Sequence, residues 1–223
     1  MLTLIKKYRL FFGVMAILSV IIISLFYNAL NPPKTLPVYN PAMVNPELVD
    51  STVQHISKYH TVGDFAFTNQ NGKVVTQDDY DGKIYVADFF FTTCQSICPK
   101  MTSNMATVQL AILNNPDVKL LSHTVMPDID NVAVLKKYAL EHNVNDQKWN
   151  LVTGDKKDIY AMARKSYLAV KLGKPEELYD MVHTENFVLV DQKRRVRGFY
   201  DGTNPEDVER LISDIEWLNA QRK

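Results

Sequence analysis

A long apolar run near the start of the chain is the strongest feature of its hydrophobic pattern. No residue from 10 to 30 is charged, and most of them are aliphatic or aromatic. At about 1.5 Å per residue in a helix, this run can cross a hydrocarbon core of about 30 Å. A cleaved signal peptide has a shorter apolar segment of about 7–15 residues and a small-x-small cleavage site, which Tyr27-Asn28-Ala29-Leu30 does not provide. The pattern therefore predicts a cytoplasmic N-terminus and an uncleaved transmembrane anchor within residues 1–30.

The charges on either side of the run predict its orientation. Lys6, Lys7 and Arg9 precede it, and only Lys34 follows it closely. Positive charge favours the cytoplasmic side, so we expect everything after Asn31 to lie outside the membrane.

Residues 31–59 are rich in proline and lack a regular hydrophobic period. Prolines at positions 32, 33, 37, 41 and 46 disfavour helix and favour extended, polyproline-like backbone. We predict that this segment is a tether that holds a folded domain, residues 60–223, off the lipid surface.

From residue 60 the pattern alternates between short apolar runs and segments of helical period. Asn69-Gln70-Asn71-Gly72 separates two short apolar segments, as in a β-hairpin with Asn-Gly at its turn. Residues 83–91 are nearly all apolar or aromatic, which suits a strand covered on both faces. Further strands are expected at 118–125, 149–152, 186–190 and 196–200, and helices at 99–113, 132–142, 155–167 and 205–220.

This alternation of strands and helices predicts an α/β sheet with crossover helices. The order of the elements is that of a thioredoxin-like fold with an extra N-terminal β-hairpin, preceded by one transmembrane helix.

The charge balance narrows the range of partners. Lys plus Arg and Asp plus Glu each number 25, so the formal net charge is zero. Nucleic-acid binding usually needs a basic face, so we expect no nucleic-acid partner. The one basic cluster lies on the predicted late hairpin, where a solvated turn is the simplest interpretation, and docking to an acidic partner or to lipid headgroups is the alternative. Its members are Lys193, Arg194, Arg195 and Arg197.

The chemistry of the chain is concentrated in its two cysteines, Cys94 and Cys98. Their i, i+4 spacing at a helix entrance brings both sulfurs within reach of one metal ion or of each other. Unpaired N–H groups and the helix dipole there lower thiol pKa values, and thiolates are both metal ligands and nucleophiles. A peroxiredoxin-type motif is excluded, because Ala87 and Phe91 occupy its Pro and Thr positions. The cysteine spacing by itself leaves metal binding and redox chemistry open.

His183 favours a metal site. A thioredoxin-type redox enzyme carries Cys-x-x-Cys and a proline just before its late hairpin strand, where this chain has a three-residue gap and a histidine. Thiolates and imidazole together suit copper or zinc, and three ligands suit Cu(I) better than structural zinc, which takes four. We therefore predict one copper ion per chain, as Cu(I) or Cu(II), bound by Cys94, Cys98 and His183. Three methionines could add a weak thioether ligand, although core filling is the simpler interpretation: Met101, Met105 and Met126.

The segment from Asp88 to Pro99 resembles the signature of the Sco/SenC family, a strand followed by Thr-x-Cys-x-x-x-Cys-Pro. Residues 182–191 are similar to the histidine segment of that family, and residues 149–154 to its Trp-x-x-Leu-Thr-Gly stretch. The resemblance covers roughly residues 60–220 and extends to the anchor and tether. It implies a thioredoxin-like fold and copper ligands at Cys94, Cys98 and His183.

The resemblance also implies a function. A Sco/SenC protein is expected to deliver copper to, or reduce the thiols of, the binuclear copper site of cytochrome c oxidase. Its expected partners are the oxidase subunit that carries this site and a periplasmic copper donor or thiol reductase. The expected location is the bacterial inner membrane, crossed once, with the C-terminal domain on the periplasmic side. The chain departs from the family pattern at Met126 and Val182, where acidic residues are usual.

Two alternative functions remain open at this point. A thiol–disulfide oxidoreductase would attack a partner protein's cysteines outside the membrane with Cys94 and resolve the mixed disulfide with Cys98. A non-catalytic binding module would instead hold the two cysteines as a buried disulfide.

Other polar residues receive structural interpretations. Asp128 and Asp130 are expected to cap the helix that follows them. Four histidines are expected on the surface or in the core, and only His123, near a strand end, has a prospect of lying near the metal. The four are His55, His60, His123 and His142.

Overall fold

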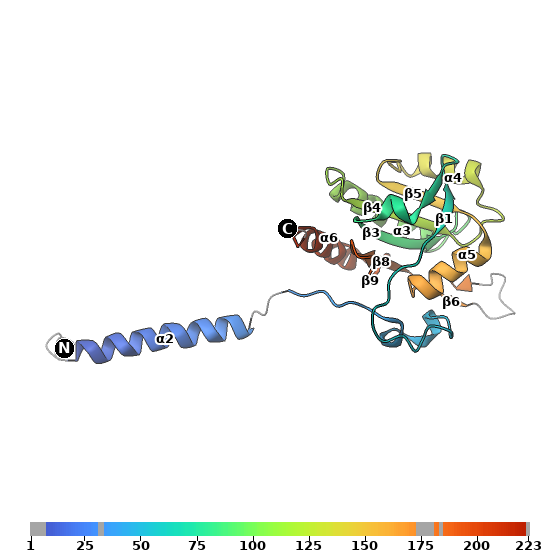
Figure 1. Ribbon diagram of the computed structural model, residues 1–223. Coiled ribbons are helices and arrows are strands. Elements are labelled where there is room, and N and C mark those ends of the chain that lie inside the picture. The colour runs from blue at the N-terminus through green and yellow to red at the C-terminus, as the bar shows by residue number, and fades with distance from the viewer. Residues whose placement is uncertain (1–7, 31–33, 173–180, 183–184, 222–223) are drawn as a thin grey trace. The chain divides into compact units, whose positions relative to one another are not determined.

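The structure, a computed structural model, describes residues 8–30, 34–172, 181–182 and 185–221 (Figure 1). The chain forms two compact units, Met1–Thr35 and Leu36–Lys223.

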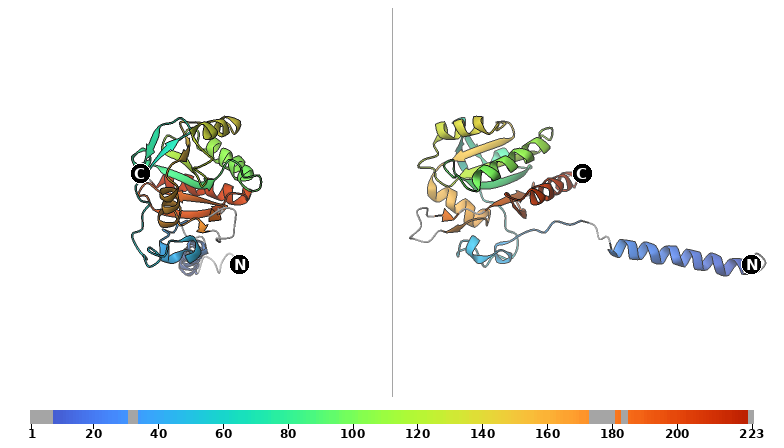
Figure 2. Two further views of the ribbon diagram at one scale, coloured as in Figure 1. Left: turned by 90° about the vertical axis from the view of Figure 1, so that its right-hand side faces the viewer. Right: turned by 180° about the vertical axis from the view of Figure 1, so that it is seen from behind.

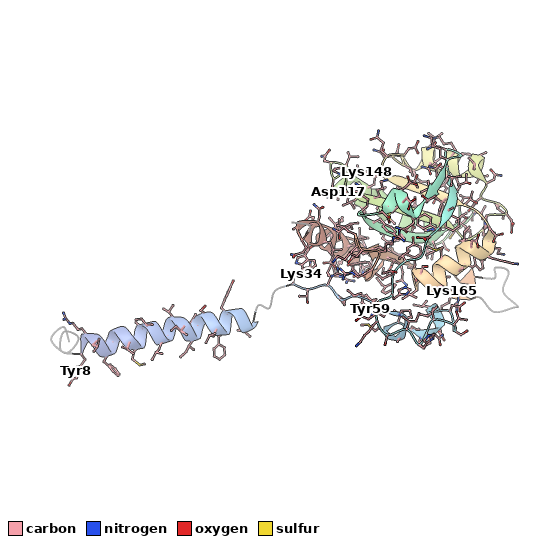
Figure 3. All side chains as sticks on the ribbon, viewed as in Figure 1. Tyr8, Lys34, Tyr59, Asp117, Lys148 and Lys165 are labelled. Carbon is pink, nitrogen blue, oxygen red and sulfur yellow. The ribbon has the colours of Figure 1, made fainter. Side chains whose placement is uncertain are left out.

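The first unit contains a single described helix, α2, which spans Arg9–Leu30 as the apolar run predicts. Its 22 residues at about 1.5 Å each give about 33 Å, long and apolar enough to cross a membrane. Side chains project all around the helix (Figure 3), and those from Leu10 to Tyr27 are exposed. An apolar surface on every side is typical of a membrane span rather than of a helix that packs in a soluble core.

The second unit is built on a seven-stranded mixed sheet with the strand order β2-β1-β5-β4-β3-β8-β9 (Figures 1 and 2). The three central strands β5, β4 and β3 are parallel, and β1 and β8 run antiparallel to them on either side. The strands are β1 Ala66–Asn69, β2 Val74–Thr76, β3 Ile84–Phe90, β4 Val118–Thr124, β5 Trp149–Thr153, β8 Asn186–Val190 and β9 Val196–Asp201.

Helices cover both faces of this sheet, so the central strands are buried throughout. Phe90 of β3 contacts Tyr138 of α4 on one face, with 5.4 Å between ring centroids. Its neighbour Phe89 points to the opposite face and contacts Tyr167 at 5.8 Å. The helices are α3 Cys98–Ala111, α4 Val132–Glu141 and α6 Pro205–Ala220 on the face of Phe90, and α5 Lys156–Ala161 on the face of Phe89. The predicted α/β architecture and N-terminal hairpin are confirmed, and so are the helices expected at 99–113, 132–142 and 205–220.

Two local features differ from the prediction. The helix expected at 155–167 is α-helical only in α5 and continues as a π-helical turn, η4, at Met162–Ser166. A second, two-stranded sheet joins β6 (Lys171–Leu172) to β7 (Met181–Val182). Strands of two residues carry no hydrophobic period, so the pattern could not predict them.

The compact unit begins at Leu36 rather than at residue 60, because most of the expected tether packs against the domain. Arg197 donates from Nη2 to the carbonyl oxygen of Leu36 at 2.8 Å and from Nε to that of Pro37 at 2.9 Å. The Tyr39 N–H donates to the Val196 carbonyl oxygen at 2.9 Å. Proline-rich extended backbone keeps its carbonyl acceptors free, and these acceptors hold it here. Two short 3₁₀ turns follow, η1 at Pro41–Met43 and η2 at Pro46–Leu48.

Candidate metal centre

Cys94 and Cys98 lie where the central strand β3 gives way to helix α3. Cys94 is in the connecting loop, and its backbone N–H donates to the Phe91 carbonyl oxygen at 3.3 Å. Cys98 is the first residue of α3, and Pro99 follows in the first turn, where no helical hydrogen bond needs its missing N–H. Ile97 stands at the N-cap and provides no side-chain acceptor. The N–H groups at this helix start are therefore left for the sulfur atoms.

A buried carboxylate ties this loop to the neighbouring strand. Asp130 accepts from the Thr92 N–H at 3.1 Å, from the Thr92 hydroxyl at 2.5 Å, and from the Thr124 hydroxyl. The interpretation of Asp128 and Asp130 as helix caps is wrong, because the N-cap of α4 is Asn131, whose side chain accepts from two backbone N–H groups. Asp130 instead fixes the start of the loop that carries the cysteines.

The sulfur of Cys94 is surrounded by hydrogen-bond donors. Burial raises the pKa of the Cys94 thiol. Hydrogen bonds from the side chain and backbone N–H of Cys98 and from Ser96 outweigh burial and lower this pKa to about 7. The hydroxyl oxygen of Ser96 lies 3.5 Å from the Cys94 sulfur. A thiol with this pKa is about half ionised at neutral pH, and the thiolate is the form that binds metals and attacks disulfides.

The second sulfur behaves in the opposite way. Cys98 is fully buried, and burial raises the pKa of its thiol well above the ordinary value, against a hydrogen bond from the Phe91 backbone N–H that lowers it. The neighbouring Cys94 and Asp88 raise this pKa further. The expectation that a helix entrance lowers thiol pKa values therefore holds for Cys94 and is wrong for Cys98, where desolvation outweighs the local donors.

Asp88 is a buried carboxyl group that the sequence analysis missed. Its Oδ1 accepts from the Ser122 hydroxyl, and the Ser122 oxygen accepts from Trp149 Nε1 at 2.8 Å. Burial raises the pKa of Asp88 to about 7, although the hydrogen bond from Ser122 lowers it. A single carboxyl in an otherwise apolar strand, six residues before Cys94, was the available signal.

His123 and His60 are buried core residues rather than neighbours of the cysteine pair. His123 pairs with Phe89 across β3 and β4, so its ring lies on the sheet face opposite to Asp88. It stacks on Phe89 at 5.0 Å and meets the edge of Phe67 at 5.5 Å. Neither ring nitrogen has a hydrogen-bond partner within the described part of the chain, and burial lowers its pKa to about 3. His123 is a neutral core residue. His60 is also buried and bonds the Ser166 carbonyl oxygen at 2.9 Å.

The methionines near the site fill space, as expected. Met101 and Met105 of α3 are fully buried in the main hydrophobic core. Met126 is half-buried and packs against the same core, and its carbonyl oxygen accepts from the Asp130 N–H at 2.9 Å.

A comparison with protein-family models identifies the group to which this arrangement belongs. Residues 53–220 match the model described as SCO1/SenC. The chain belongs to the SCO1/SenC family.

Solved structures of the family agree with this fold. A SCO1/SenC family lipoprotein from Bacillus anthracis str. Ames is 36% identical with a TM-score of 0.65, over 72% of this chain and 95% of that one. BsSco, described with a disulfide switch as a member of the Sco family of cytochrome c oxidase assembly proteins, is 33% identical with a TM-score of 0.59, over 70% and 92%. Bradyrhizobium japonicum ScoI, solved with copper bound, is 26% identical with a TM-score of 0.57, over 72% and 99%.

The third residue of the predicted site, His183, lies outside the described residues. Among the described residues, no group of three His, Cys, Asp or Glu side chains is placed to hold a metal ion. The pairing of β8 with β3 nevertheless shows where the described strand that follows His183 in the sequence lies. Ala87 of β3 pairs with Val188 of β8, so Asn186 lies toward the carboxyl end of β3, from which the cysteine loop departs. His183 precedes Asn186 by three residues.

Proposed function

We propose that this chain is a membrane-anchored copper-binding protein that takes part in maturing the binuclear copper site of cytochrome c oxidase. The observation that carries the proposal is the pair of free cysteines at the β3–α3 junction of a SCO1/SenC fold. We assign Cys94, Cys98 and His183 as the ligands of one copper ion. The soft sulfur donors of this set suit Cu(I), and three protein ligands are enough for it.

The chain's own groups prepare the site for this cargo. Cys94 offers a thiolate near neutral pH without any metal, because four donors from Cys98 and Ser96 already surround its sulfur. Cys98 must lose its proton when copper enters, and the positive ion then replaces that proton in a buried place. Asp130 fixes the start of the loop that carries the cysteines through its hydrogen bonds with Thr92.

The location is part of the same proposal. The helix Arg9–Leu30 would cross the bacterial inner membrane once, and the unit from Leu36 would lie on the periplasmic side. Lys6, Lys7 and Arg9 before the apolar run support a cytoplasmic N-terminus. In this arrangement, residues 31–35 form the connection between anchor and domain. The partners would be the oxidase subunit with the binuclear copper site and a periplasmic copper donor or thiol reductase.

Copper titration of the reduced full chain in detergent, against a chromophoric Cu(I) chelator, tests the ligand set. We expect one copper per chain for the wild type and for His55→Ala, a control that removes an exposed histidine. We expect much weaker binding for Cys94→Ala, Cys98→Ala and His183→Ala. Equal affinity in the wild type and in His183→Ala would remove His183 from the site. For the cellular role, cells that lack the protein should contain an oxidase deficient in its binuclear copper.

The asymmetry of the two thiols favours a second candidate function, thiol–disulfide exchange with a partner protein. The Cys94 thiolate would attack a partner disulfide, releasing one partner thiolate and forming a mixed disulfide. Cys98, after losing its proton, would then attack Cys94, so that the partner leaves as a dithiol and this chain is oxidised to a disulfide. Cys98→Ser should trap the mixed disulfide, and Cys94→Ser should not. If neither variant forms an adduct with oxidised partner, this function is excluded.

A further inference from the structure

A basic pocket lies at the edge of the domain, away from the cysteines. It is formed by the β8–β9 turn and the last turns of α6 and has a volume of about 560 Å³. Lys193, Arg195 and Arg197 line it from the turn, and Trp217 lines it from the helix. The copper proposal uses none of these residues.

The charge of this pocket is positive. Arg195 and Arg197 both contact one carboxylate, Asp191, at 2.7 and 2.8 Å. Lys193 is exposed and forms no ion pair with any residue that the structure describes. Two arginines thus share a single carboxylate, whose pKa is lowered, despite its burial, by hydrogen bonds from both of them. Among the charged residues that line the pocket, three cations face the one carboxylate of Asp191, which leaves Lys193 without an anionic partner among the described residues.

The start of the compact unit is attached to this same pocket. Arg197, which lines it, holds the carbonyl oxygens of Leu36 and Pro37 at 2.8 and 2.9 Å. Tyr39 reinforces the attachment, because its ring meets Phe199 edge-on at 5.1 Å.

Covalent connectivity then limits how far the pocket can be from the bilayer. Only residues 31–35 separate the end of the apolar helix from Leu36. Six residue steps span at most about 20 Å. This step depends on the proposed anchoring of Arg9–Leu30 in a membrane. If the helix is anchored, the basic pocket stays within reach of lipid headgroups.

The side chain of Trp217 fits such a position. It is half-buried beside the pocket, and tryptophan is enriched at membrane–water interfaces because its ring is apolar and its N–H is polar. We propose that the pocket of Lys193, Arg195, Arg197 and Trp217 binds the phosphate of an anionic phospholipid headgroup and holds the β8–β9 edge of the domain against the bilayer. The short connection to the apolar helix favours lipid over an acidic protein as the occupant.

Tryptophan quenching by brominated lipid tests the proposal on the full chain in nanodiscs. The discs contain a constant fraction of brominated phosphatidylcholine and a rising fraction of phosphatidylglycerol. Of the two tryptophans, Trp149 is buried and shielded, so Trp217 reports contact with lipid. We expect quenching to increase with the phosphatidylglycerol fraction, and we expect Trp217→Phe to abolish this increase.

Lys193→Gln removes one exposed cation and should raise the phosphatidylglycerol fraction needed for half-maximal quenching about fivefold, the effect of about 1 kcal/mol per basic residue near a membrane surface. The control Lys137→Gln removes an exposed cation from α4 and should change nothing. Quenching that ignores phosphatidylglycerol in properly inserted chains would overturn the lipid proposal and leave the pocket to an acidic protein. A chain that fails to insert into discs would overturn the anchoring as well. Copper binding by Lys193→Gln should equal that of the wild type, so loss of the lipid response is distinguishable from failure of the copper proposal.

Discussion

Replacing Asp88 by asparagine should change how the stability of the domain depends on pH. The side chain is 3% exposed, and burial raises its pKa from an ordinary 3.8 to about 7. Between these two values the folded state keeps the proton and the unfolded state releases it. Stability therefore falls as pH rises, at about 1.4 kcal/mol per pH unit, and is lowest above pH 7. Over about three pH units, Asp88 costs on the order of 4 kcal/mol.

The wild-type curve alone cannot show this effect, because His123 acts in the opposite direction. Burial lowers the pKa of His123 to about 3. Between this value and the ordinary histidine pKa, the unfolded state therefore binds a proton that the folded state does not bind. Stability then rises with pH up to the ordinary histidine pKa of about 6.5, with a similar slope. The contributions of Asp88 and His123 nearly cancel between pH 4 and pH 6.5. In Asp88→Asn the contribution of His123 is no longer cancelled, so the variant should gain more stability than the wild type as pH rises from 4 to 6.5.

Urea unfolding of the reduced chain in mild detergent, followed by tryptophan fluorescence at a series of pH values, measures both curves. Asparagine keeps an oxygen that can accept from Ser122, although its extra N–H adds a constant penalty of about 1–3 kcal/mol. The informative quantity is therefore the slope of the difference between variant and wild type. The free energy of unfolding of the variant should gain on that of the wild type by about 4 kcal/mol between pH 4 and pH 7.5. A difference that does not change with pH would refute a raised pKa for Asp88.

Three further predictions concern the site. Alkylation of the reduced protein by iodoacetamide should modify Cys94 with a midpoint near pH 7 and leave Cys98 nearly untouched, and the Cys94 midpoint should rise in Cys98→Ala, which removes the thiol donor. The apparent Cu(I) affinity should rise tenfold per pH unit between pH 8 and pH 9, where only Cys98 still has a proton to lose, and more steeply below pH 7. Asp130→Ala leaves the donors of Thr92 and Thr124 unsatisfied, so urea unfolding should show a loss of roughly 3 kcal/mol, with weaker copper binding and a smaller defect in Asp130→Asn.

The elements that the sequence predicted well are those encoded by local patterns. The uncharged run of α2, the Asn-Gly turn before β2 and the apolar strand β3 all have signals within a few neighbouring residues. The cysteine pair is equally local, since both cysteines lie within the five residues 94–98 at one helix entrance. Such features need no knowledge of what lies across the domain.

The features that were missed depend on contacts between distant parts of the chain. The docking of residues 36–40 depends on Arg197, more than 150 positions away in the sequence. Arg197 donates to backbone carbonyl oxygens, which every residue type has, so the sequence does not reveal these contacts. Asp130 has the same character, because a carboxylate just before a helix usually caps it, and only the fold brings Thr92 within reach. The proline content was correctly taken to disfavour helix, but extended backbone is also suited to pairing with the edge of a sheet.

The environment of the two sulfurs implies that the two proposed activities, copper binding and disulfide exchange, would compete for one site. Either activity starts from the Cys94 thiolate, which the chain stabilises with its own donors. Either activity is completed only when the buried Cys98 gives up its proton, and the chain opposes that step through burial and through the nearby carboxyl of Asp88. A bound copper ion would offset the cost of burying the Cys98 thiolate with its positive charge, whereas a disulfide would leave no thiolate charge to bury. The raised pKa of Cys98 therefore keeps its thiol protonated in the empty, reduced site, so that the site does not react as a free dithiol. Cys98 would lose its proton only when copper binds or when the disulfide forms.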